Sequence, residues 1–102
     1  MSHRVEFSPE APGDLIDLYD HFAQRDGPER AIGYVERIED YCRSLSVFPE
    51  RGISRDDLRM GLRIIGFERR VVIALRATAE TVTILRILYG GRDLETVFPE
   101  YG

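Results

Sequence analysis

The chain has 102 residues, of which 43% are hydrophobic and 31% are charged, and this composition excludes a disordered protein. Its formal net charge of -4 argues against a protein whose main task is to hold nucleic acid by its phosphates. No apolar run approaches the roughly 18 residues that a membrane-spanning helix requires, and the first residues do not resemble a signal peptide. We therefore expect residues 1–102 to form one cytoplasmic domain that does not bind a membrane.

The basic residues are unevenly distributed and all of one type. Residues 1–50 contain 5 Arg and 11 acidic residues, whereas residues 51–102 contain 9 Arg and 7 acidic residues. No lysine is present, so no mechanism that needs one is available. A lone Cys42 cannot form an internal disulfide or a thiolate metal site. The sequence thus predicts neither a metal nor a cofactor.

The first half of the chain predicts one strand and two helices. Residues 4–7 alternate polar and apolar side chains, as in a short strand. Ser8, Pro9 and Glu10 are typical of a helix start, and an apolar stripe at helical spacing follows. Gly27 and Pro28 end this helix. A second stripe begins at Ala31 and runs for about five turns until Pro49. The short connection between the two stripes predicts an antiparallel helical hairpin.

The second half predicts a sheet, because the apolar period changes from 3.6 to 2. Residues 62–67, 71–77 and 82–89 read as three strands, and their short connections predict an antiparallel meander. The resulting order is β-α-α-β-β-β. We therefore expect an α+β fold of two layers, in which the helical hairpin packs on one face of a small, mainly antiparallel sheet.

Several local signatures, in order along almost the whole chain, resemble the RelE/ParE toxin superfamily. They are residues 7–11 with Asp14 and Leu15, residues 27–28 with Ala31, Leu45, residues 48–49, residues 51–52, residues 56–63 and residues 84–95. The last stretch is fairly specific to the ParE-like branch. The resemblance implies the RelE/ParE toxin fold over the whole chain.

The same resemblance implies a function and two partners. A member of this superfamily is the toxin of a type II toxin–antitoxin system and forms a hetero-oligomer with its antitoxin. For the ParE-like branch it implies a ParD-like antitoxin with an acidic amphipathic segment, and growth inhibition by poisoning of DNA gyrase, so that a cleaved DNA complex persists.

The RNA-cleaving branch of the superfamily is the alternative. For this branch, the resemblance implies a cluster of lysines, arginines and a tyrosine. These side chains would move protons and stabilise the phosphorane. Arg63 and Arg92 match two arginine positions, but Phe98 stands where the tyrosine is expected. We therefore expect no catalytic residues and a non-enzymatic inhibitor. A ribosome-dependent mRNA endoribonuclease and an inert protein that only binds antitoxin remain the other readings.

Strand alternation predicts a partner surface on the face of the sheet away from the helices. The residues assigned to this face are Arg63, Ile65, Phe67, Val72, Ala74, Arg76, Val82, Ile84, Arg86 and Leu88. Seven of these ten are apolar, although a solvated face should be polar, and an apolar patch of this size typically marks an interaction site. Two other readings stay open: residues 91–102 fold back over this face, or a homodimer buries it.

From this face we predict the antitoxin-binding residues, namely Arg63, Ile65, Phe67, Arg76, Ile84, Arg86 and Leu88. Their three guanidinium groups suit bidentate contacts with acidic residues. On this hypothesis, Arg86→Glu weakens antitoxin binding without unfolding the domain. Arg59 and Arg92 are predicted to contact the target, although solvated surface is the alternative for the arginine-rich loop around Arg59.

Overall fold

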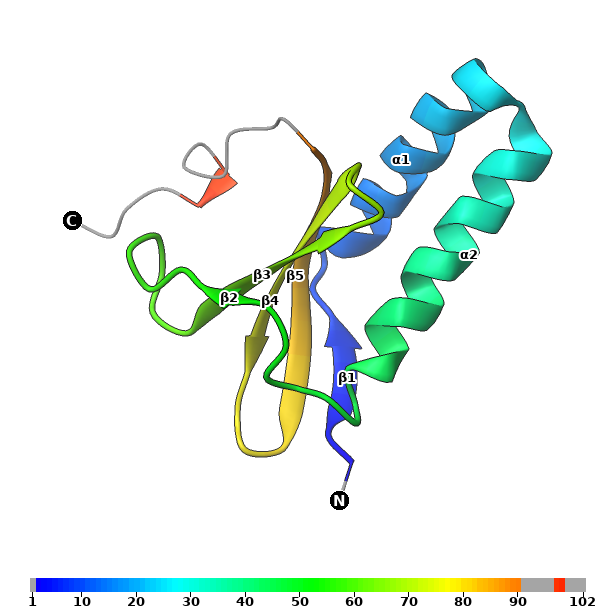
Figure 1. Cartoon of the computed structure of the whole chain (residues 1–102). Helices are drawn as coiled ribbons and strands as arrows, with labels where there is room; N and C mark the ends of the chain where they lie inside the picture. The colour runs from blue at the N-terminus through cyan, green and yellow to red at the C-terminus, as the bar shows by residue number, and fades with distance from the viewer. Residues whose placement is uncertain (1, 91–96, 99–102) are drawn as a thin grey trace.

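The computed structural model describes residues 2–90 and 97–98. Its elements, in chain order, are β1 (Arg4–Phe7), α1 (Ala11–Asp26), α2 (Pro28–Ser44), β2 (Ile53–Ser54), β3 (Leu62–Phe67), β4 (Val71–Ala77) and β5 (Thr81–Tyr89). The predicted α+β order is confirmed, and the structure adds the two-residue strand β2. Figure 1 shows the helical hairpin lying along one side of the twisted strands.

The helical hairpin follows from local chemistry at both of its joints. The Ser8 hydroxyl accepts a hydrogen bond of 3.3 Å from the N–H of Ala11 and donates one of 2.6 Å to the carbonyl of Leu85. It therefore supports the start of α1 and ties it to β5. Gly27 has a φ of 93°, a conformation that glycine adopts at little cost, and Pro28 then opens α2. Neither helix is long and apolar enough to cross a membrane.

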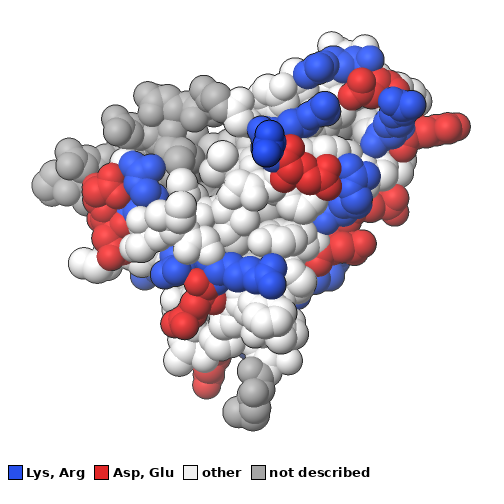
Figure 2. All heavy atoms as spheres, viewed as in Figure 1, with Lys and Arg blue, Asp and Glu red and all other residues white. Residues whose placement is uncertain are grey.

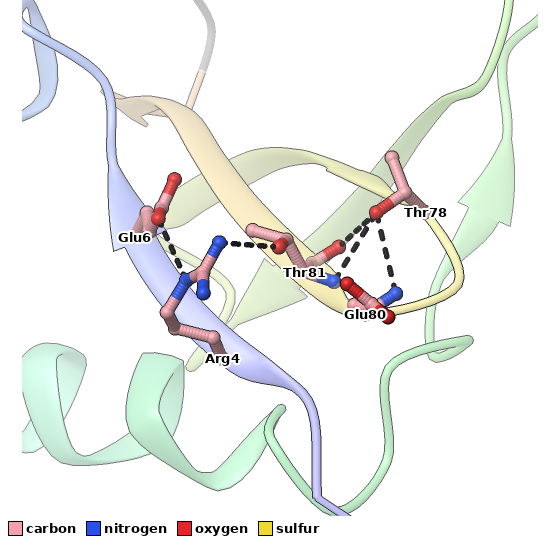
Figure 3. A network of polar contacts seen from close by, with 5 residues as sticks. All are labelled: Arg4, Glu6, Thr78, Glu80 and Thr81. Carbon is pink, nitrogen blue, oxygen red and sulfur yellow. Dashed lines mark hydrogen bonds and ion pairs between the residues drawn. The ribbon is translucent and has the colours of Figure 1, made fainter.

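The sheet has the strand order β1-β5-β4-β3-β2. β1 runs parallel to β5 and pairs with its residues 81–84, whereas the other neighbouring strands are antiparallel. The β4–β5 turn is closed by Thr78, whose hydroxyl accepts hydrogen bonds from the N–H groups of Glu80 and Thr81 (Figure 3). Arg4 of β1 reaches the Thr81 hydroxyl at 3.3 Å. This contact fastens the parallel strand to the turn.

The main core lies between the hairpin and the sheet. It is formed by apolar residues from both helices and from β3, β4 and β5: Ala11, Leu18, Phe22, Ala31, Tyr34, Ile38, Cys42, Leu45, Ile65, Val71, Ile73, Leu75, Val82, Ile84 and Ile87. Burial raises the pKa of the Cys42 thiol to about 12, so this side chain stays neutral and packs as a small hydrophobic group. A smaller cluster of Leu58, Leu62, Ala74 and Phe98 lies on the opposite face, which we call the outer face.

The predicted phase of β3 is wrong by one residue. Ile65 and Phe67 face the helices, where the Phe67 ring lies 6.0 Å from that of Tyr34 and 5.3 Å from that of Tyr41. Leu62 and Ile64, which the predicted alternation of β3 directs toward the helices, lie on the outer face instead. Because side chains alternate with a period of two, a shift of one residue exchanges the two faces of the whole strand.

The prediction for β5 is wrong at Val82 and Ile84, for a different reason. Its register shifts where Ala74 pairs with Arg86 and Leu75 pairs with Ile84, so that Leu85 is an extra residue. Val82 and Ile84 before this bulge and Ile87 after it therefore all belong to the core that faces the helices. A bulge interrupts strict alternation, and the predicted outer-face position of Ile84 is incorrect.

Candidate interaction surfaces

The outer face is partly covered by the chain itself. Phe98 is 6% exposed and packs with Leu58 against Leu62 and Ala74, with Val97 alongside. The prediction that this face stands open is thus wrong where Leu58 and Phe98 lie. The alternative, in which the end of the chain folds back, holds for Val97 and Phe98 among the residues that the structure describes.

Arg63 is not on the outer face. It pairs with Leu75, a core residue, and its guanidinium donates hydrogen bonds to the carbonyls of Arg51, Glu50 and Gly52 at 3.2, 2.8 and 2.9 Å. These bonds hold the segment that leads into β2 against the edge of β3. Arg63 is therefore used within the fold, and its predicted position on the outer face is incorrect.

Arg86 forms a partly buried ion pair with Asp14 of α1. Its Nε and Nη2 donate to the two carboxylate oxygens at 2.7 and 2.8 Å, and the N–H of Ile87 donates to the same carboxylate at 3.0 Å. The side chain of Asp14 is only 6% exposed and that of Arg86 24% exposed. The hydrogen bond to Asp14 raises the pKa of Arg86. Arg86 therefore joins α1 to β5 and does not offer a free cation to a partner.

The remaining predicted site residues differ in their exposure and in their place in the fold. Arg76 is exposed on the outer face, as predicted, and Leu88 pairs with Val72 on that face but is only 2% exposed. The guanidinium carbon of Arg59 lies 5.7 Å from the centre of the Phe98 ring. Arg92, the other predicted target contact, lies outside the described residues.

A groove runs between the outward sides of α1 and α2. It has a volume of about 540 Å³ and is lined by Pro12, Leu15, Ile16, Tyr19, Ile32, Val35, Glu36 and Glu39. Ile16 and Ile32 are 62% and 52% exposed, and apolar side chains that gather in one groove typically mark an interaction site. We call this feature the helix groove. Sequence reasoning missed it because it considered the apolar stripes of the two helices only as contacts with the sheet.

A second recess lies between the helical hairpin and the β3–β4 turn. It has a volume of about 500 Å³ and is lined by Phe22, Asp26, Arg30, Gly33, Tyr34, Arg37, Glu68 and Arg70. We call it the Tyr34 pocket. Figure 2 shows blue and red side chains interleaved over the upper right of the view, where the helices lie, and uncharged side chains over its centre.

The walls of the Tyr34 pocket are held by an ion pair. Arg37 of α2 donates two hydrogen bonds of 3.1 Å to Glu68 in the turn, and its guanidinium lies 5.0 Å from the centre of the Tyr34 ring. The bond to Glu68 raises the pKa of Arg37, and the bond to Arg37 lowers that of Glu68. Burial raises the pKa of the Tyr34 hydroxyl, so this group stays protonated.

These features describe a small α+β protein with grooves suited to binding. Within residues 2–90 and 97–98, no three His, Cys, Asp or Glu side chains are grouped to hold a metal ion. The chain matches the family model described as "ParE toxin of type II toxin-antitoxin system, parDE" over residues 5–94. It therefore belongs to the ParE toxin family and is the toxin component of a type II toxin–antitoxin system.

Two relatives agree with this assignment. The chain is 38% identical over 82 residues, 80% of its own length and 81% of the relative's, to Toxin ParE3 of Caulobacter vibrioides. Its fold is similar to a chain in the solved structure titled "Chromosomal ParDE TA system from P. aeruginosa", with a TM-score of 0.75 and 27% sequence identity. That match covers 86% of this chain and 96% of the other.

The two arginines of the outer face provide a matched test of the Asp14 contact. Arg86→Glu places a carboxylate beside Asp14, and we expect it to lower the free energy of unfolding by roughly 3 kcal/mol. Arg76→Glu, at an exposed position on the neighbouring strand, should change it by less than about 0.5 kcal/mol. Urea unfolding followed by circular dichroism measures both, and equal losses would refute the structural role of Arg86.

Proposed function

We propose that the chain stops growth by binding and poisoning DNA gyrase in the cytoplasm, and that a ParD-like antitoxin keeps it silent. Membership in the ParE toxin family supports this target and this partner. The proposal rests on which side chains stand at the positions that the RNA-cleaving branch would use for catalysis, and on what those side chains contact. Each of these positions that the structure describes is occupied by a side chain with a structural role.

Arg63 is the first such position. A cation that stabilises a phosphorane must direct its N–H groups toward the reacting phosphate, but the Arg63 guanidinium donates to three backbone carbonyls. Nε and Nη2 of Arg63 thus donate to the backbone carbonyls of residues 50–52. This geometry favours a protein that inhibits by binding over one that cleaves RNA.

Phe98 is the second position. It stands where the ribonucleases are expected to carry a tyrosine, and its ring is buried against Leu58, Leu62 and Ala74. Phenylalanine has no hydroxyl, so it cannot transfer a proton, and the absence of lysine from the sequence removes another general acid. A chain with this set has no evident route for cleavage by the 2′-hydroxyl.

For the antitoxin, we propose that the apolar side of its amphipathic segment lies in the helix groove. Ile16 and Ile32 project from the two walls of the groove and are more than half exposed. Burying such side chains against a partner contributes about 25 cal/mol per Å² of apolar surface. This surface replaces the residues of the sheet, Ile65, Phe67 and Ile84, that belong to the core.

Two assays distinguish gyrase poisoning from RNA cleavage. Purified toxin should inhibit supercoiling by gyrase and increase the amount of cleaved DNA, whereas primer extension on translated mRNA should show no new ends. Arg92→Ala, in the stretch that resembles ParE-like toxins, should weaken the effect on gyrase. Arg43→Ala, on the exposed side of α2, is the control. Specific cuts in mRNA with normal gyrase activity would contradict the proposal.

The helix groove is tested through antitoxin affinity. The double variant Ile16→Ser and Ile32→Ser changes side chains that are more than half exposed, so the free energy of unfolding should fall far less than it does for substitutions in the core. Loss of the two apolar contacts should weaken antitoxin binding at least tenfold, because each buried side chain is worth roughly 1.5–3 kcal/mol. Isothermal titration calorimetry measures the affinity. Val47→Ser, at another exposed apolar position, is the matched control, and an unchanged affinity in the double variant would exclude the groove.

A further inference from the structure

The Tyr34 hydroxyl is a buried polar group that the fold does not use. Tyr34 is 7% exposed, and its hydroxyl has no hydrogen-bond partner among the residues that the structure describes. Tyr34 lines its pocket together with Arg37, Glu68 and Arg70, and the guanidinium of Arg37 lies 5.0 Å from the centre of the Tyr34 ring. Buried polar groups are nearly always paired, and a donor left unpaired beside arginines is suited to an anion that enters from outside.

The arginines of the pocket are placed to attract such an anion. Arg30, Arg37 and Arg70 line it together with two acidic residues, Asp26 and Glu68. Arg30 lies in the first turn of α2, where a positive charge opposes the helix dipole. Its position therefore does not stabilise the helix, but it does bring a third guanidinium to the pocket.

The pocket is also preformed. Glu68 and Arg69 have φ angles of 47° and 60°, the left-handed values of the two central residues of a hairpin turn, and the N–H of Arg70 closes this turn by donating to the carbonyl of Phe67. The bidentate contact between Arg37 and Glu68 joins this turn to α2. Because Glu68 occupies Nε and Nη2 of Arg37, this ion pair shapes the pocket, and Arg30 and Arg70 are the arginines that can meet an incoming anion.

We infer that the Tyr34 pocket is a recognition site for a carboxylate side chain of a protein partner. The Tyr34 hydroxyl donates to the incoming carboxylate, and Arg30 and Arg70 neutralise its charge. Asp26 and Glu68 at the same pocket would repel the neighbouring phosphates of a nucleic-acid strand, whereas a single carboxylate on an apolar segment avoids them. This chemistry favours the single carboxylate of a peptide over a polyanion.

Within the proposed function, on which this step rests, the partner is the antitoxin. Its acidic residues cannot pair with the helix groove, where Glu36 and Glu39 lie. Gly33 in the pocket directly follows Ile32 in the groove along α2. A segment that crosses α2 at this point can place apolar residues in the groove and a carboxylate in the pocket.

The chemistry of the site is tested on the free toxin with small probes. Titration with N-acetyl-glutamate α-amide, followed by NMR of the arginine Nε–H groups, should shift Arg30, Arg37 and Arg70. The neutral glutamine analogue, inorganic phosphate and the dinucleotide d(TpT) are the comparisons. Weaker binding of all three than of the glutamate probe supports a carboxylate site. Stronger binding of phosphate or d(TpT), or no shift with any probe, would overturn it.

Variants then test the partner. Tyr34→Phe removes an unpaired hydroxyl, so the thermal midpoint should not fall, but affinity for the cognate antitoxin should fall about tenfold. Arg30→Gln should weaken binding about two- to fivefold, and Arg43→Gln on the same helix should leave it unchanged. Equal antitoxin affinities for all variants would overturn the inference alone. Failure of the wild-type toxin to bind antitoxin or gyrase would instead refute the proposed function.

Discussion

The carboxylate of Asp14 joins the start of α1 to the middle of β5 by accepting three hydrogen bonds, two from Arg86 and one from the N–H of Ile87. β1 pairs with β5 only as far as Ile84. Beyond that point, the carboxylate of Asp14 accepts the hydrogen bond from the backbone N–H of Ile87 at the edge of β5. The contact therefore sets where the hairpin lies on the sheet. Because the Tyr34 pocket is lined by both the hairpin and the β3–β4 turn, its shape depends on this placement.

The same physics separates the arginines that hold the fold from those that can act on a partner. Arg86 and Arg63 meet a carboxylate or several carbonyls of their own chain, because a cation that is partly withdrawn from water must be paired. Arg30 and Arg70 instead line a recess beside an unpaired hydroxyl. The composition of the chain does not distinguish these two kinds of arginine.

The sequence predicted the elements well and the faces of the sheet poorly. Helices that bury one stripe leave a clear period, so both were found. β3 carries apolar residues on both faces, Ile65 toward the helices and Ile64 away from them, so alternation could not give its phase. The bulge at Leu85 leaves no local signal, and Asp14 meets Arg86 across 72 positions. Tyr34 lies within the apolar stripe that begins at Ala31, and only the structure reveals that its hydroxyl has no hydrogen-bond partner among the described residues.

A double-mutant cycle at Asp14 and Arg86 tests this central constraint most directly. Free energies of unfolding are measured for the wild type, Asp14→Asn, Arg86→Met and the double variant. If the ion pair fixes the hairpin on the sheet, the two changes are strongly coupled, with an interaction energy of about 2 kcal/mol. If the effects of the single variants add to within about 0.5 kcal/mol, the pair does not hold α1 against β5 and the account is contradicted.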